Sequence, residues 1–130
     1  MARAMAHDTR VPGPDHPITV EPTASRVVVR VGGLVVADTT AALTLREADY
    51  GPVQYVPLAD IEPSLLRRTQ TSTYCPFKGT AAYYTIAVPG GDELTDAVWT
   101  YEEPYPAVAE IGSHAAFYPG RVEILVDGRA

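Results

Sequence analysis

The chain has 130 residues, 46% of them apolar and 20% charged, which is typical of one globular domain with its own core. Without an apolar run of roughly 20 residues, and with only ten scattered basic residues against sixteen acidic ones, the sequence disfavours a membrane span and nucleic-acid binding. A single cysteine excludes an intrachain disulfide and a cysteine-rich zinc site. Because no signal-peptide pattern begins the chain, we expect a cytoplasmic protein without metal or cofactor.

The first seventeen residues show no hydrophobic periodicity and are rich in proline and polar side chains. Such a composition predicts a flexible N-terminal arm over residues 1–17, with His7 and His16 in solvent. The remainder, residues 18–130, is expected to form a single domain.

Runs of β-branched residues predict strands over residues 18–20 and 26–31. A glycine pair then predicts a hairpin turn into a returning strand over residues 34–37. Residues 39–45 continue or bend that strand. A capped helix over residues 38–43 is the alternative, which we disfavour because one apolar turn is too short for a helix.

The second half of the chain is predicted to consist of further short strands, separated by glycine and proline turns. The expected strands cover residues 53–56, 80–88, 97–101, 115–118 and 121–126. The last two are expected to form a closing hairpin. Helical turns are expected over residues 60–66 and 106–111, and a polar loop over residues 67–73. About seven strands with at most two helical turns predict an all-β domain.

The single cysteine and the single lysine of the chain lie within four residues of each other. Pro76 favours an extended Cys75 and Gly79 can adopt a positive φ, so the residues from Cys75 to Lys78 are predicted to form a β-turn. This turn would bring the thiol close to the ammonium group, and a nearby cation favours the nucleophilic thiolate. The alternative is that Cys75 is a small buried apolar residue.

Lys78 is the single lysine of a chain that has arginine at its nine other basic positions. This favours a role for the amine itself, as a general base, a Schiff-base former or an anchor for a carboxylate. A solvated turn residue is the alternative. Glu47 is expected to be the proton partner if it faces this turn, and a surface carboxylate otherwise.

None of the eleven aromatic residues precedes Tyr50. Several of them combine apolar area with a group that forms hydrogen bonds, as the wall of a small-ligand pocket requires. The candidate ligand-binding residues are Tyr55, Tyr83, Trp99, Tyr101 and Tyr118. The alternative is that these side chains belong to the core.

A set of short motifs extends over nearly the whole of residues 18–126. It comprises Arg26-Val27 with the glycine pair, residues 37–39, Glu47, residues 55–60, residues 73–79, Tyr83, residues 97–101 with Pro104, and residues 116–118. On these residues the chain resembles the bacterial proteins grouped as domain of unknown function 427 (DUF427). The resemblance implies a small β-tent fold, with two antiparallel sheets leaning together as in methionine sulfoxide reductase B. The paired cysteine ligands that hold zinc in relatives of that fold are missing here, so we expect the fold without zinc.

Two classes of function follow from these residues. The first is an enzyme acting on a small molecule, possibly of specialised metabolism, in a pocket between the sheets, with Cys75 as nucleophile or acid, Lys78 as base or clamp and Glu47 as proton partner. The second is a non-catalytic module that binds a small molecule in the same pocket. A buried Glu47 and Lys78 next to Cys75 would favour the enzyme, whereas an inward-packed Cys75 beside a rigid aromatic wall would favour the binding module.

Overall fold

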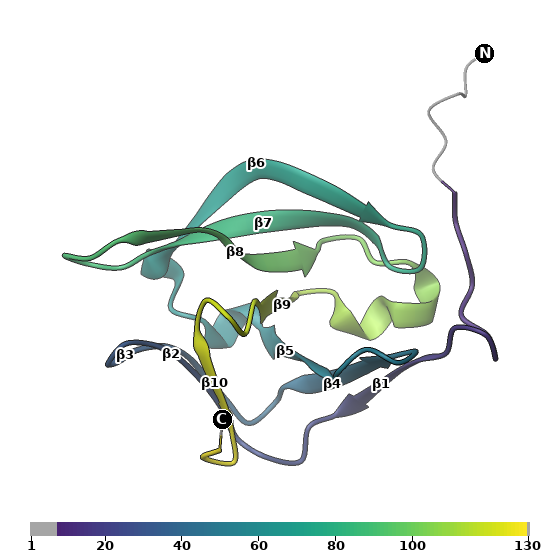
Figure 1. Cartoon of the computed structure of the whole chain (residues 1–130), viewed down its shortest axis with the longest axis horizontal. Helices are drawn as coiled ribbons and strands as arrows, with labels where there is room; N and C mark the ends of the chain where they lie inside the picture. The colour runs from purple at the N-terminus through teal and green to yellow at the C-terminus, as the bar shows by residue number, and fades with distance from the viewer. Residues whose placement is uncertain (1–7, 130) are drawn as a thin grey trace.

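The computed structural model describes residues 8–129, and ten strands in this part of the chain form two antiparallel sheets (Figure 1). In spatial order, the larger sheet contains β1 (Ile18–Pro22), β4 (Leu43–Glu47), β5 (Val53–Pro57), β9 (His114–Phe117), β8 (Glu93–Tyr101), β7 (Gly79–Ala87) and β6 (Leu66–Cys75). The smaller sheet contains β10 (Glu123–Val126), β2 (Val27–Val31) and β3 (Leu34–Thr39). The predicted all-β class with two antiparallel sheets is confirmed.

The helical content of the described residues is limited to three short 3₁₀ segments. These are η2 (Leu58–Asp60), η3 (Pro63–Leu65) and η4 (Pro106–Ile111). None of them has the length and hydropathy of a membrane span. The helical turns predicted in these two regions are therefore present in 3₁₀ form.

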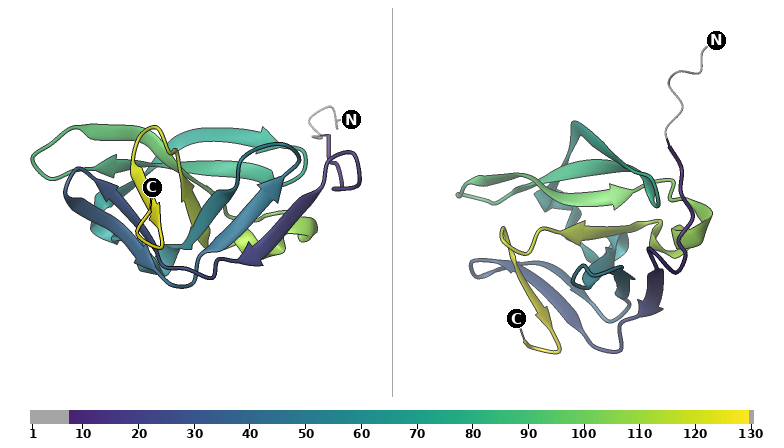
Figure 2. Two further views of the ribbon diagram at one scale, coloured as in Figure 1. Left: turned by 60° about the horizontal axis from the view of Figure 1, so that its bottom comes forward. Right: turned by 45° about the vertical axis from the view of Figure 1, so that its right-hand side comes forward.

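The larger sheet folds over on itself (Figures 1 and 2). Strands β6, β7 and β8 form one layer, and β1, β4 and β5 form the layer facing it. Strand β9 joins the two layers, since it pairs with β8 on one side and, through Val56 and Pro57, with β5 on the other. The space between the layers holds the side chains that matter below.

Strand β7 is buried on both faces because successive side chains alternate between two clusters of the core. Tyr84 and Ile86 pack with the cluster that also contains the valines of the smaller sheet. Ala81 and Tyr83 belong to a second cluster, which lies beside the site. The complete second cluster is Leu45, Tyr55, Ala81, Tyr83, Tyr101, Val108, Ile111 and Ala116.

Two predictions about local structure are wrong. Residues 67–73, predicted as a polar loop, belong to the ten-residue strand β6, which is polar because it is the outermost strand of its sheet and mostly exposed. The predicted closing hairpin is also absent, since β9 and β10 belong to different sheets. Strand β10 pairs instead with β2, nearly a hundred residues earlier in the chain.

The chain between β3 and β4 bends instead of forming the alternative helix over residues 38–43. The hydroxyl of Thr39 accepts a hydrogen bond of 2.9 Å from the backbone N–H of Ala41 and donates one of 2.7 Å to Asp60. This local turn ends β3 and lets β4 begin in the other sheet.

Candidate functional site

The hairpin between β6 and β7 contains the predicted β-turn. The backbone N–H of Lys78 donates to the carbonyl of Cys75 at 3.2 Å, and Gly79 has a φ of +111°. A side chain at Gly79 would also approach the carbonyl of Glu103, since an added Cβ would lie 3.4 Å from that oxygen. The turn thus depends on glycine at this position, and it directs Lys78 inward between the layers.

Lys78 and Glu47 form a buried ion pair. The ammonium of Lys78 donates a hydrogen bond to Oε1 of Glu47, and the two side chains are only 10% and 14% exposed. Glu47 is the last residue of β4, so the pair connects the facing layers of the larger sheet.

The second oxygen of Glu47 is bound by His16, whose Nε2 lies 2.7 Å from Oε2. Burial raises the pKa of Glu47, but the hydrogen bonds from Lys78 and His16 outweigh that effect and hold the pKa below its usual value. The carboxylate is therefore ionised at neutral pH, with both oxygens engaged.

His16 is a residue of the site that the sequence interpretation missed. It was expected in solvent, and this is wrong: its ring is half-buried and stacks on Phe77 with 4.0 Å between the ring centroids and 4° between the planes. The physical reason is the pairing of β1 with β4, in which Ile18 lies opposite Glu47 and brings the preceding residues to the carboxylate. Recognising that pairing would have placed His16 beside Glu47. His7 lies outside the described residues.

A cavity of about 290 Å³ opens beside this ion pair. Its walls come from both layers of the folded sheet. The lining residues are Leu45, Glu47, Tyr50, Val53, Tyr55, Lys78, Tyr83, Trp99, Tyr101 and Tyr118. Seven of the eight candidate site residues from the sequence lie around this one space; the eighth, Cys75, does not line it.

The aromatic wall is held together by hydrogen bonds and ring contacts. The indole N–H of Trp99 donates to the hydroxyl of Tyr55 at 3.1 Å, and the two rings meet edge to face. Trp99 also contacts Tyr118, with 4.6 Å between the ring centroids. The hydroxyl of Tyr83 is hydrogen-bonded to Thr73 at 2.8 Å. This network fixes the wall before any ligand arrives.

The tyrosine hydroxyls around the cavity stay protonated. Burial raises the pKa of Tyr55 and of Tyr101 above its ordinary value, and raises that of Tyr118 to about 12. These groups are therefore hydrogen-bond donors over the whole physiological pH range.

Cys75 is partly buried and packs against the second cluster of the core. This is the position expected of the small apolar residue in the alternative interpretation. The turn thus brings its lysine, and not its cysteine, to the cavity wall.

A family model described as a domain of unknown function (DUF427) matches residues 19–128. The chain belongs to the DUF427 family. No curated protein matches the chain.

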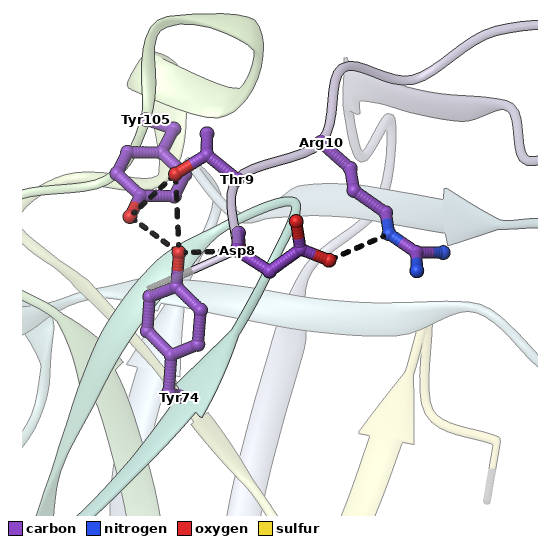
Figure 3. A network of polar contacts seen from close by, with 5 residues as sticks. All are labelled: Asp8, Thr9, Arg10, Tyr74 and Tyr105. Carbon is purple, nitrogen blue, oxygen red and sulfur yellow. Dashed lines mark hydrogen bonds and ion pairs between the residues drawn. The ribbon is translucent and has the colours of Figure 1, made fainter. Parts of the chain in front are cut away.

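In this DUF427 domain, residues 8–10 lie against the end of β6 (Figure 3). The hydroxyl of Tyr74 donates to the backbone carbonyl of Asp8 at 2.9 Å and is hydrogen-bonded to that of Tyr105 at 2.6 Å, while Thr9 contacts both tyrosines. The backbone N–H of Arg10 donates to the carbonyl of Pro76 at 2.9 Å. The described part of the predicted arm is thus attached to the same turn that presents Lys78.

Within residues 8–129 of the DUF427 domain, no group of three or more histidine, cysteine or acidic side chains is arranged to hold a metal ion. The chemistry available at the cavity is therefore that of an ammonium, a carboxylate, an imidazole and several hydroxyls.

Proposed function

We propose that this DUF427 domain is an enzyme that acts on a small organic molecule bound in the cavity, with Lys78 and Glu47 as its charged working groups. The observation that carries the proposal is their buried ion pair on the cavity wall. Burying two charges costs several kcal/mol per ion, and replacing such a pair by apolar residues is often neutral or stabilising. Stability alone therefore explains poorly why these two residues are here, whereas proton transfer or charge stabilisation explains it well.

The proposed roles follow from the charge of each group. Glu47 is ionised and serves as the proton acceptor, because Lys78 and His16 hold its carboxylate in place. Lys78 stabilises negative charge that develops on an oxygen of the substrate, as a fixed ammonium in a water-poor cavity does effectively. The aromatic side chains orient the apolar part of the substrate.

A non-catalytic binding module is the second candidate function, and one observation favours it. Cys75 packs against the core cluster and the aromatic wall is already fixed by the bond between Trp99 and Tyr55. A preformed wall without a nucleophilic thiol also suits a protein that only holds its ligand.

The test is to incubate a small amount of protein with an extract of small metabolites and to follow the consumed and formed species by mass spectrometry. We expect conversion of many molar equivalents by the parent protein and none by Lys78→Met or Glu47→Gln. The matched control is Arg67→Met, which breaks an exposed ion pair with Glu93 away from the cavity and should convert normally. Undiminished conversion by Lys78→Met and Glu47→Gln would contradict the proposed roles, and stoichiometric retention of an unchanged compound would establish the binding module.

We also propose that the protein works in the bacterial cytoplasm on a small-molecule partner rather than on nucleic acid. The formal net charge of −6 and a free cysteine support this proposal.

A further inference from the structure

The cavity contains a buried hydroxyl that lacks a hydrogen-bond partner among the described residues. Tyr101 is only 6% exposed and lines the cavity, yet its hydroxyl bonds to nothing within residues 8–129. The neighbouring hydroxyls of Tyr55 and Tyr83 are both partnered. Because a buried polar group without a partner costs about 1–3 kcal/mol, Tyr101 needs a group from outside the chain to complete it.

Lys78 offers further unused donors on the same wall. An ammonium carries three N–H donors, and within the described part of the chain that of Lys78 donates only to Glu47. Both oxygens of Glu47 are already engaged, by Lys78 and by His16. The cavity thus presents spare donors beside an occupied acceptor, and the ligand that complements it contributes an oxygen that accepts hydrogen bonds.

The charge balance distinguishes between the two common oxygen acceptors. Lys78 and Glu47 neutralise each other, so a carboxylate ligand would add an uncompensated negative charge next to that of Glu47 in a site with little solvent. A neutral carbonyl oxygen accepts the same two hydrogen bonds without that cost. The balance favours the uncharged carbonyl.

A second, apolar cavity of about 230 Å³ continues past Trp99. It shares Val53 and Trp99 with the first cavity and is lined further by side chains such as Phe117 and Ile124. The amide of its one polar side chain, Gln54, is already hydrogen-bonded on both sides. This cavity therefore suits a hydrocarbon group and offers no unpaired polar partner.

We infer that the site takes an uncharged carbonyl compound with an apolar tail, whose carbonyl oxygen accepts hydrogen bonds from Tyr101 and Lys78 while the tail passes Trp99 into the second cavity. This inference rests on the proposed function for the location of the site and names its substrate class. It also gives Glu47 a defined task, because a carbonyl held by two donors makes the hydrogens on the adjacent carbon acidic enough for a nearby carboxylate to accept.

Binding can be measured directly, because Trp99 is the only tryptophan of the chain and lines both cavities. The intrinsic fluorescence of the purified protein is titrated with 2-octanone, octanoate, octylamine and 2-butanone. We expect 2-octanone to bind at least tenfold more tightly than each of the other three. The first two comparisons test the neutral acceptor, and 2-butanone tests the tail.

Two variants locate the contacts. Tyr101→Phe removes only the hydroxyl, and it should weaken 2-octanone at least tenfold while the melting temperature stays the same or rises, because no partner within the protein is lost. Ile124→Phe fills the second cavity and should reduce 2-octanone to the affinity of 2-butanone without changing the latter. Val35→Phe, at an exposed position on β3, is the matched control for the added ring and should leave all affinities unchanged.

Several results would overturn the inference: no binding of 2-octanone, tighter binding of octanoate, equal affinity for the two ketones, or unchanged ketone binding in Tyr101→Phe. A Tyr101→Phe protein that melts well below the parent would assign the hydroxyl a structural role and also overturn it. These outcomes are separate from those of the proposed function. Ketones that bind but are not converted in any mixture would sink the enzyme alone, whereas conversion of a compound without a carbonyl would sink this inference alone.

Discussion

Replacement of Lys78 by methionine removes one charge of the buried pair and keeps most of the apolar stem. Glu47 would remain as a carboxylate that is only 14% exposed, with His16 as its one remaining side-chain partner. Breaking a buried ion pair from one side costs about 3–5 kcal/mol, and the remaining bond to His16 places the expected cost near about 3 kcal/mol. An unfolding entropy of about 2.1 cal/mol/K per residue gives about 0.27 kcal/mol/K for this chain, so the melting temperature should fall by about 11 °C.

The assay is a double-mutant cycle by urea unfolding and thermal melts at pH 7, with Lys78→Met, Glu47→Gln and the combination. The combined variant buries no unpaired charge, so it should recover at least about 2 kcal/mol relative to the sum of the single effects. The matched control is Arg67→Met, whose pair with Glu93 has side chains 63% and 50% exposed and should change stability by less than about 0.5 kcal/mol. Single effects that add to within about 0.5 kcal/mol, or a control as costly as Lys78→Met, would refute the reasoning.

Four further predictions concern the same hairpin and its partners. Because the folded pKa of Glu47 lies below its unfolded value of about 4.3, the stability that this carboxylate provides is present above that pH and is lost as the pH falls through the folded pKa; the gap between the urea midpoints of the parent and Glu47→Gln should therefore narrow from pH 7 to pH 3, and a widening gap would contradict this. Lys78→Arg keeps the charge but not the compact amine, so 2-octanone should bind at least tenfold more weakly to a folded protein, and equal binding would show that charge suffices. Cys75→Ala should retain substrate conversion, because Cys75 packs against the core and does not line the cavity, and complete loss would make it the nucleophile. Gly79→Ala should lower stability by about 1–3 kcal/mol in a thermal melt because φ is +111° there, and an unchanged melt would show that the turn relaxes freely.

The features that sequence reasoning predicted well depend on neighbouring residues. The turn from Cys75 to Lys78 follows from Pro76 and Gly79, which restrict the backbone within the turn itself. The hairpin between β2 and β3 follows in the same way from its glycine pair, of which Gly32 has a φ of +60°.

Pairings between distant segments were not accessible from the sequence in this way. Strand β6 lacks the alternation of apolar and polar residues, because most of its side chains on both faces are in solvent and its strand conformation comes from its ladder with β7. The partner of β10 is determined by the packing of the smaller sheet, and nothing in residues 115–126 marks that choice.

The site shows the same division. Alternation places Trp99 and Tyr101 on one face of β8, and this was predicted. That Tyr83 lies directly opposite Trp99 depends on the register of β7 and β8, which the sequence leaves open. His16 was missed for a similar reason, since it reaches Glu47 only through the pairing of β1 with β4.

The position of β9 and β10 has a consequence for the order in which the newly synthesised chain can assemble. Strand β9 completes the larger sheet between β5 and β8, and β10 completes the smaller sheet against β2. Both are among the last segments to leave the ribosome, so β2 and β5 emerge with unpaired edges and wait for partners about sixty to a hundred residues downstream. Exposed edges of this kind are templates for pairing with other chains. The nascent protein therefore passes through its most aggregation-prone interval just before its final residues appear.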